Sequence, residues 1–405
     1  MKKKILFLHP NFPAQFKNIV KHFSEQNHEI IFICQTNSCK PDKDIKLLVL
    51  TGKLGEETLN SLKLDTIQRS FKLANQYRSG FEELVRRNWV PDIIISHSGW
   101  GCGAYAKELW PKSHVISYLE WWFDPDSAAY TYNENNSNLG LTKEIGTKHW
   151  LRNAILSLEI TAADTIISPT KWQKEQLPIS LKPRCRVIFD GIDQKKYNNI
   201  KTDAGYEKNK HKLLTYGTRG MEPMRCFPEF ITCLPRIIAK NPNIMVEIAG
   251  TDEINYGGKK PSSGSWKNWA KEYLEKYKCQ GNIKWIGRLP EEKYISWLKK
   301  SSCHVYLTHP FVASWSLIEA IHCCRKIVAS DVEAVREFYI KDRMILVDHR
   351  NNTLLEEAIT SQLQKKSNSP PKPLTLDMDR LGIDTCMSKW DEACGLQLHI
   401  EKENV

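Results

Sequence analysis

Short apolar runs alternate with longer amphipathic stretches along most of the chain. Runs such as 5–8, 93–95 and 327–329 are continuously apolar and are bounded by polar or proline-containing turns. Such runs are typical of strands covered on both faces, as in parallel sheets flanked by helices. The alternation therefore predicts an α/β protein. We expect strands at residues 5–8, 29–34, 46–50, 91–97, 114–118, 165–168, 186–189, 213–216, 244–249, 282–286, 305–307 and 327–329.

Helical patterns fill most of the segments between these strands. The region 56–88 keeps a helical period with some slippage, which suggests two packed helices. The polar stretch 130–141 is expected to be a mobile loop, and the polar, lysine-rich segment 196–210 has no core pattern and suggests a linker.

The stretch 305–338 combines a strand, a polar loop, a helix and a second strand. Its loop places Ser314, Ser316 and backbone N–H groups at the start of the helix, where anions are readily bound. Glu319 lies one turn inside that helix, too far in to act only as a cap. A buried carboxylate near a phosphate site needs hydrogen-bond donors, and the two hydroxyls of a ribose would supply them.

Two positively charged residues follow another predicted strand. The strand 213–216 leads into Gly217, and Arg219 and Arg225 follow, six residues apart, before a helix at 227–239. Two arginines beside a helix N-terminus would suit a diphosphate group. The alternative is a pair of surface arginines, which the glycine-rich strand exit disfavours.

In the first half of the chain, polar residues follow strands at their carboxyl ends, where ligands bind in open α/β sheets. His97 ends the strand 91–97, and the three glycines in 99–103 let the backbone approach a ligand. Glu120 follows the strand 114–118, beside aromatic residues that could stack on a sugar ring or form a buried patch. A lone histidine is more often structural, so the prediction that His97 belongs to a ligand site depends on its place at a strand end.

The loop after the first strand, 9–16, contains two prolines and no glycine. Dinucleotide-binding folds have a glycine-rich fingerprint at this place, so its absence counts against a dehydrogenase. Phe12 and Gln15 in this loop either face a ligand or belong to a rigid turn.

Composition sets the class of protein. A length of 405 residues allows two domains, each with its own core, and 41% apolar and 26% charged residues fit a soluble globular protein. No apolar run approaches the length of a membrane span, and the basic start is followed only by the short run 5–8, which is a first strand rather than an export signal. The twelve cysteines show no C-x-x-C pairs or zinc spacing, so a cytoplasmic location is expected.

The chain has 58 basic and 47 acidic residues and a net charge of +11. Lysine is spread through helices and loops, which favours a solvated basic surface. Attraction to anionic substrates or to an anionic membrane face stays open. Nucleic acid is not an expected partner, because no binding motif accompanies the charge.

The segment SWSLIEAIHCCRKIVASD resembles the nucleotide-sugar signature of glycosyltransferase family 4. Glu319 and Ala320 match the Glu-Ala pair of that family, and VASD matches its next strand. Further landmarks occur in matching order between about residues 5 and 345: HSGWG, SYLEWWF, SPTKWQ and FDGID. Members of the family have the GT-B fold, so the resemblance implies an α/β protein with two Rossmann-like parallel-sheet domains facing each other across a cleft.

The resemblance also implies roles for individual residues. Glu319 would contact the ribose, Arg219 and Arg225 would hold the diphosphate, and the turn at 287–290 would contact the base through its backbone. The donor-site residues implied are Gly217, Arg219, Arg225, Gly250, Arg288, Val312, Ala313, Ser314, Ser316 and Glu319. The acceptor-side residues implied are Phe12, Gln15, His97, Gly99, Trp100 and Glu120. Catalysis would depend on His97, Arg219 and Arg225, with no metal ion and no cofactor.

Three positions depart from the family pattern. Phe311 stands where the first of two glutamates is expected, Cys226 follows Arg225 in place of a glycine, and Cys324 replaces the glycine after the signature helix. Arg225 itself stands where a lysine is usual. These departures predict altered contacts to the donor sugar.

The resemblance divides the chain into four parts. Residues 1–195 would form the acceptor-side domain, 196–210 a linker, and 211–372 the nucleotide-sugar domain. Residues 373–405 would form a helix that crosses back to the first domain.

The expected function is retaining transfer of a sugar from a nucleotide-sugar to a glycan, lipid or small-molecule acceptor. Attack would come from the face of the leaving group, and the leaving phosphate would take the proton of the acceptor. Two alternatives remain: a non-catalytic nucleotide-sugar-binding protein of the same fold, which the three departures would explain, and a sugar-nucleotide epimerase. The expected location is cytoplasmic, with peripheral attachment to the inner face of the membrane left open.

Overall fold

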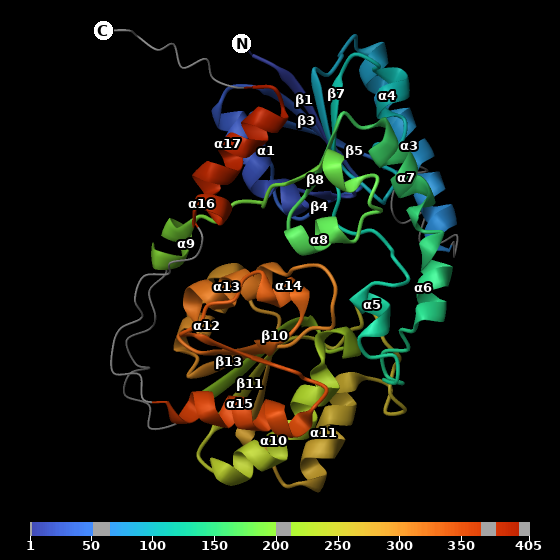
Figure 1. Ribbon diagram of the computed structural model, residues 1–405. Helices are drawn as coiled ribbons and strands as arrows, with labels where there is room; N and C mark the ends of the chain where they lie inside the picture. Colours follow the sequence, from blue (N-terminus) through green and yellow to red (C-terminus); the bar gives the residue numbers. More distant parts are fainter. Residues whose placement is uncertain (1, 52–64, 200–211, 366–377, 397–405) are drawn as a thin grey trace. The chain divides into compact units, whose positions relative to one another are not determined.

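Two parallel sheets, each with helices packed against it, organise the chain (Figure 1). The computed structural model describes residues 2–51, 65–199, 212–365 and 378–396. The chain forms two units. The first combines Met1–Asp124, Thr147–Ile192 and Asp377–Val405, and the second combines Pro125–Gly146 and Asp193–Leu376.

The sheet of the first unit has seven parallel strands in the order β5-β3-β1-β6-β7-β8-β9. The strands are β1 (Lys4–Leu8), β3 (Glu29–Cys34), β5 (Ile45–Val49), β6 (Ile93–His97), β7 (His114–Tyr118), β8 (Thr165–Ser168) and β9 (Cys185–Val187). Two short strands, β2 (Asn11–Phe12) and β4 (Thr36–Asn37), pair separately. The helices of this unit are α1 (Lys17–Glu25), α3 (Thr66–Arg86), α4 (Ala106–Leu109), α7 (Asn153–Ala162), α8 (Lys171–Glu175), α16 (Met378–Leu381) and α17 (Ile383–Ala393).

The sheet of the second unit has six parallel strands in the order β12-β11-β10-β13-β14-β15. The strands are β10 (Leu213–Gly220), β11 (Met245–Thr251), β12 (Ile283–Gly287), β13 (Cys303–Tyr306), β14 (Ile327–Ser330) and β15 (Met344–Val347). The helices are α5 (Ala128–Thr131), α9 (Gln194–Asn199), α10 (Phe227–Lys240), α11 (Trp266–Lys276), α12 (Glu291–Lys300), α13 (Trp315–Cys323), α14 (Glu333–Arg336) and α15 (Asn352–Gln364), while α6 (Lys143–Trp150) spans the boundary between the units. Short 3-10 turns are η1 (Ala14–Phe16), η3 (Lys182–Arg184), η5 (Pro223–Arg225) and η6 (Gln280–Asn282).

In both sheets the first strand in the chain lies in the middle. The next two strands lie on one side of it, and the later strands lie on its other side. This is the strand order of a Rossmann domain, in which ligands bind where the order reverses. The reversal falls between β1 and β6 in the first unit and between β10 and β13 in the second. The predicted α/β class with two Rossmann-like parallel-sheet domains is confirmed.

The apolar runs form strands because both of their faces are covered. In the first unit Leu6 and Ile94 are buried in one cluster with Phe81 of α3. In the second unit Val246 is buried in a cluster with Phe230 of α10. Each such side chain stabilises the fold by about 1.5–3 kcal/mol when it is fully buried.

The segment Pro125–Gly146 belongs to the second unit, although a first domain spanning 1–195 was expected. Within that unit, Arg350 Nη1 donates to the carbonyl oxygen of Tyr132 at 2.7 Å, and Tyr132 Oη donates to Asp348 at 3.2 Å. His309 Nε2 donates to the carbonyl oxygen of Ala129 at 2.9 Å. The expected mobile loop at 130–141 is therefore a bonded segment, because its polar groups find partners in the second unit.

Two further expectations fall partly outside the described residues. Over the described part of 56–88, α3 is one helix of 21 residues rather than two, started by Asp65, which accepts from the N–H of Gln68. Most of the expected linker 196–210 lies beyond Asn199, the last described residue before the gap.

The last helices belong to the first unit. Trp390 of α17 is buried and stacks on Tyr118 with ring centroids 6.3 Å apart, and His22 Nε2 lies 2.9 Å from Asp391.

Candidate functional site

The reversal point of the second unit gathers two arginines and an aromatic side chain. Arg225 is buried, and its Nη1 donates to Thr308 Oγ1, just after β13, at 2.8 Å. The ring centroid of Tyr256, on the loop after β11, lies 4.5 Å from Arg225 Cζ and 6.0 Å from Arg219 Cζ. Arg219 is exposed. Two guanidinium groups at this point can hold an anionic ligand, as guanidinium groups commonly do with phosphates.

Glu222 fixes the loop that carries Tyr256. Its side chain is fully buried, and Oε2 accepts from the N–H groups of Asn255 and Tyr256 at 2.8 Å and of Gly257 at 3.2 Å. Burial raises the pKa of this carboxyl, although the three N–H groups act in the opposite direction. Oε1 has no hydrogen-bond partner in the described part of the chain. The contacts of Oε2 hold the loop so that Tyr256 stays against the arginines.

The signature helix α13 begins where it was expected. Ser314 caps it by accepting from the N–H of Ser316 at 3.3 Å, and the two hydroxyl oxygens lie 2.7 Å apart. Glu319 lies close to Tyr197 and Tyr294: burial first, and then the Glu319 charge, raise the pKa of both phenols.

The remaining predicted donor-site residues lie within β10, near the end of β11, after β12 and in the loop before α13. A Cβ at Gly217 would lie 2.8 Å from Tyr294 Oη, and a Cβ at Gly250 would lie 2.3 Å from the carbonyl oxygen of Thr218. Only glycine fits at these two positions without a shift of the neighbours. Arg288 is exposed after Gly287. In the signature loop Val312 is buried and Ala313 is half-buried.

In the first unit, His97 and Glu120 meet at the predicted edge of the sheet. His97 Nε2 lies 3.4 Å from Glu120 Oε2, which is the distance of an ion pair rather than of a short hydrogen bond. Gln15 Nε2 donates to Glu120 Oε1 at 3.1 Å. The Glu120 side chain is 32% exposed and that of His97 only 3%, so Glu120 is the member of the pair that a ligand can reach.

The contacts of the two side chains define what the pair can offer. His97 Nδ1 donates to the carbonyl oxygen of Ser98 at 3.1 Å, because a carbonyl oxygen can only accept. Burial raises the pKa of the Glu120 carboxyl, but the contacts with His97 and Gln15 outweigh burial, so this pKa is lowered. Glu120 is therefore a carboxylate that can accept a hydrogen bond from a ligand.

Two residues of this region were missed by sequence reasoning. The buried ring of His9 packs edge-on against His97 with centroids 4.9 Å apart. Glu159 of α7 accepts from the N–H of Gly99 at 2.6 Å and of Gly103 at 3.0 Å, and burial raises its pKa to about 7. His9 lies at a strand end and could have been found by the rule that located His97. Glu159 lies within an ordinary helix, and nothing local marks it.

Three predicted acceptor-side residues have different surroundings. Gly99 has a φ of 95°, which suits glycine, and Trp100 is 43% exposed. Phe12 is buried with its ring 5.0 Å from that of Phe32, so it packs in the core and we leave it out of the proposed site.

The two cysteine departures differ in backbone conformation. Cys226 has a φ of 51°, in the left-handed region, where a glycine would avoid strain. Cys324 has a φ of −94° and is buried, with Sγ 3.3 Å from the carbonyl oxygen of Leu298. Only the first position therefore needs a glycine for a conformational reason.

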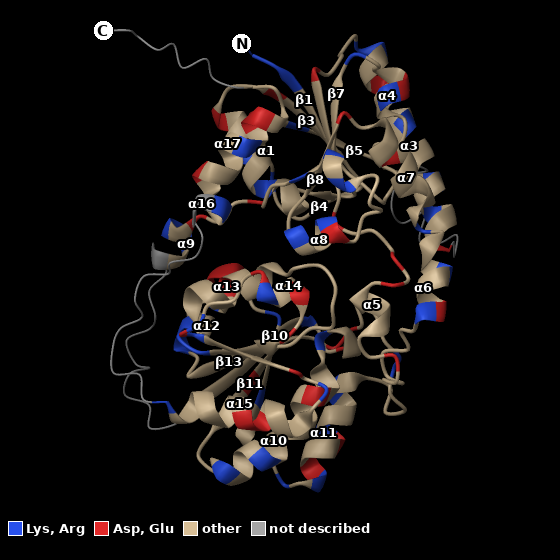
Figure 2. Cartoon of the chain, in the orientation of Figure 1, with Lys and Arg blue, Asp and Glu red and all other residues tan. Residues whose placement is uncertain are grey.

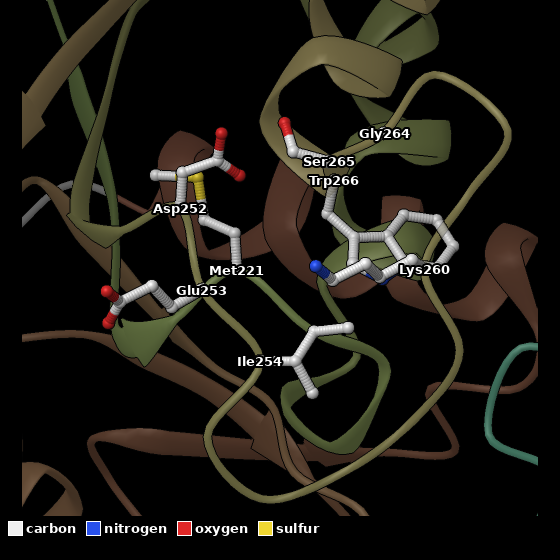
Figure 3. Close-up of a pocket in the computed structure, with 8 residues that line it drawn as sticks. All are labelled: Met221, Asp252, Glu253, Ile254, Lys260, Gly264, Ser265 and Trp266. Atoms are coloured by element: carbon white, nitrogen blue, oxygen red, sulfur yellow. The ribbon is translucent and has the colours of Figure 1, made fainter. Parts of the chain in front are cut away.

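Other features of the described residues add little to this site. No group of three His, Cys, Asp or Glu side chains there could hold a metal ion, and no described helix is long and apolar enough to cross a membrane. Figure 2 shows Lys and Arg spread over helices of both units. A pocket of about 300 Å³ lies between Asp252 and Glu253 on one side and Ser265, Trp266 and Lys260 on the other, and no predicted site residue lines it (Figure 3).

Comparisons with known proteins agree with this organisation. Residues 26–197 match the Glycosyl transferase family 4 group, and residues 196–373 match the Glycosyl transferases group 1 family. No curated protein matches the chain.

Solved structures of similar fold cover nearly the whole chain. Anabaena Alr3699/HepE, in complex with UDP and glucose, is 12% identical with a TM-score of 0.66, over 98% of this chain and 100% of that one. A glycosyltransferase from Rickettsia africae is 14% identical with a TM-score of 0.63, over 100% of both chains. Sucrose-phosphate synthase from Thermosynechococcus elongatus is 13% identical with a TM-score of 0.62, over 97% of this chain and 96% of that one. At such identities the likeness shows the fold, and the family matches supply the activity class. The chain therefore belongs to the family 4, group 1 glycosyltransferases and is a glycosyltransferase with the GT-B fold.

Proposed function

We propose that the protein transfers a sugar, with retention of its anomeric configuration, from a nucleoside diphosphate sugar to a glycan, lipid or small-molecule acceptor. The observation that carries this proposal is the pair Arg219 and Arg225 around Tyr256, at the reversal point of the second sheet. A diphosphate held there would lie at the carboxyl ends of β10 and β13, the usual ligand position in such sheets.

In the proposed reaction the bond between the anomeric carbon and the diphosphate breaks, and negative charge develops on the leaving oxygen. Arg219 and Arg225 stabilise this charge, and Glu319 accepts hydrogen bonds from the ribose hydroxyls. The acceptor hydroxyl attacks from the same face, and its proton passes to the leaving phosphate. Two fixed cations supply the charge that a metal ion would otherwise supply, so we propose that the reaction needs neither a metal ion nor a cofactor.

We assign His97, Glu120, Gln15, Gly99 and Trp100 to the acceptor side. Glu120 is the exposed member of its pair with His97, and its carboxylate can accept a hydrogen bond from an acceptor hydroxyl. A peripheral contact of this basic protein with the anionic inner face of a membrane, in the cytoplasm, belongs to the same proposal. Co-sedimentation with vesicles containing an anionic lipid, at low and high salt, tests it.

The first experiment is thermal stabilisation of the full chain by UDP, GDP, ADP, CDP and TDP sugars. A ligand that binds the folded state raises the melting temperature, more so as its concentration exceeds its dissociation constant. UDP sugars come first, because the Anabaena protein was crystallised with UDP and with UDP-glucose. We expect one nucleotide class to give a clear shift that Arg219→Ala and Glu319→Ala abolish. Product analysis by NMR then reports the anomeric configuration.

A non-catalytic nucleotide-sugar-binding protein is the second candidate. Phe311 supports it, because a phenyl ring replaces a carboxylate that the family pattern places beside the sugar. Stabilisation by a nucleotide-sugar without hydrolysis or transfer in a broad acceptor screen would favour this candidate. Release of an epimerised free sugar would instead indicate an epimerase.

A further inference from the structure

We propose that Tyr256 and Phe311 form an aromatic wall of the donor-sugar subsite, which selects a sugar bearing a methyl group, as a 6-deoxy or an N-acetyl sugar does. This inference rests on the proposed function and names the class of donor. It makes Tyr256, which no sequence pattern marks, a specificity-determining residue.

The wall is placed by the contacts of Arg225. This guanidinium lies between Thr308 Oγ1, to which it donates at 2.8 Å, and the ring of Tyr256, 4.5 Å from its Cζ. Phe311 follows Thr308 by three residues, and its ring meets that of Tyr256 at a centroid distance of 6.3 Å and an angle of 63°. We therefore place a sugar attached to a phosphate on Arg225 beside these two rings.

The position of Tyr256 is fixed rather than fortuitous. Three consecutive N–H groups, those of Asn255, Tyr256 and Gly257, point to Oε2 of the buried Glu222. Two residues further on, the N–H of Lys259 donates to the carbonyl oxygen of Asn138 at 2.7 Å. The loop is thus held on both sides of Tyr256, on one side by Glu222 and on the other by the segment Pro125–Gly146.

The chemistry of the wall sets the preference. A sugar hydroxyl turned toward the faces of the two rings, away from the Tyr256 hydroxyl, loses its water and gains no hydrogen-bond acceptor of comparable strength. A methyl group in the same place buries apolar surface against them. Glutamate at position 311 would have the opposite effect, because its carboxylate accepts hydrogen bonds from sugar hydroxyls.

The test compares a glucose donor with two donors that carry a methyl group, one at C6 and one in an N-acetyl group at C2. Binding to the full chain is measured for the glucose, 6-deoxyglucose and N-acetylglucosamine derivatives of whichever nucleoside diphosphate stabilises the protein most. We expect one methyl-bearing donor to bind about tenfold more tightly than the glucose donor, as one apolar group in a matching pocket can achieve. Phe311→Glu should reverse the order, and Tyr256→Ala should reduce the preference.

Tyr256 is partly exposed, so Tyr256→Ala is expected to fold even if Phe311→Glu does not. Tyr277→Ala, at an exposed tyrosine elsewhere in the second unit, is the matched control and should leave the preference unchanged. Tighter binding of the glucose donor than of both methyl-bearing donors, or an unchanged preference in Tyr256→Ala, would overturn the inference. If no nucleoside diphosphate stabilises the chain, the proposed function fails first, which distinguishes the two.

Discussion

Each unit fixes a loop beside its candidate site with one buried carboxylate, yet the two carboxylates are used differently. In the first unit both oxygens of Glu159 accept, Oε2 from Gly99 and Oε1 from Gly103. In the second unit, Oε2 of Glu222 accepts hydrogen bonds from all three N–H groups of its loop, and Oε1 accepts none from the described residues.

This difference shows what each loop presents. The loop held by Glu159 contains three glycines, at 99, 101 and 103, and carries the exposed side chain of Trp100. The loop held by Glu222 presents the ring of Tyr256 to two arginines. In the proposed function, the first unit thus offers an exposed carboxylate and an indole ring to a hydroxyl-bearing acceptor. The second unit offers positive charge and an aromatic surface to a donor that leaves as an anion.

Removing the guanidinium group of Arg225 should have the largest effect on activity. Arg225→Ala is expected to lower kcat/KM by about 10²–10³-fold, the effect of losing one group that stabilises transition-state charge. Arg225→Lys should keep most of the activity, because it retains the charge and restores the residue usual in the family. Initial rates of transfer or donor hydrolysis measure both, with melting curves to confirm folding. Arg236→Ala, at an exposed arginine of α10, is the control. Equal losses in the alanine and lysine variants would contradict a role based on charge.

The Glu159 carboxylate should make stability depend on pH. Its pKa in the folded protein, about 7, lies above the ordinary value of 4.5, so the folded state holds the proton more tightly than the unfolded state does. The stability that this proton contributes is fully present below pH 4.5 and is lost as the pH rises to about 7, by roughly 3 kcal/mol. Urea unfolding across this range measures the slope.

Glu159→Gln should remove that slope, since glutamine does not titrate. Glu108→Gln, at an exposed carboxylate of the same unit, should keep it. If the free energy of unfolding changed with pH in the same way in the wild type and in Glu159→Gln, the Glu159 carboxyl would have an ordinary pKa.

The contrast between the two carboxylates also shows how far the sequence can be interpreted. Both sheets could be predicted, because strands buried on two faces appear as continuous apolar runs such as 5–8 and 327–329. His97, Arg219 and Glu319 could be proposed because strand ends and helix starts are visible in the sequence. Glu159 could not, because it bonds a loop about 60 residues away and its helix has an unremarkable local pattern. The pairing of Tyr256 with Arg225 depends likewise on a contact that no spacing rule gives.

The segment Pro125–Gly146 escaped prediction for a related reason. Its polar composition is typical of a solvated loop, whereas Tyr132 and Asn136 bond Asp348 and Glu229 of the second unit. Polar residues whose partners lie far along the chain cannot be told from solvated ones by composition.

Neutralising Glu120 should have a smaller effect. Glu120→Gln removes the negative charge that lies 3.4 Å from His97 Nε2, and it weakens the hydrogen bond that an acceptor hydroxyl would donate to this side chain. We expect kcat/KM to fall about tenfold, because a hydrogen bond to a charged group contributes roughly 1.5 kcal/mol or more. Initial rates at varied acceptor concentration measure this. Glu82→Gln, at an exposed position, is the control. An unchanged kcat/KM would mean that Glu120 does not contact the acceptor.

The smallest expected effect concerns Cys226, whose φ of 51° brings the backbone into the left-handed region at the start of α10. Both Cys226→Ala and Cys226→Gly lose the buried sulfur, but only the glycine variant relieves the strain between Cβ and the backbone. Because that strain costs about 1–2 kcal/mol and glycine loses about 0.5–1 kcal/mol to chain entropy, Cys226→Gly should be more stable than Cys226→Ala by up to about 1.5 kcal/mol. At Cys324, where φ is −94°, the same pair of variants should show the reverse order, since alanine adopts that conformation freely and glycine has only its entropic disadvantage. Urea unfolding of the four variants gives both differences. If the order were the same at both positions, backbone conformation would not be what distinguishes these two departures from the family pattern.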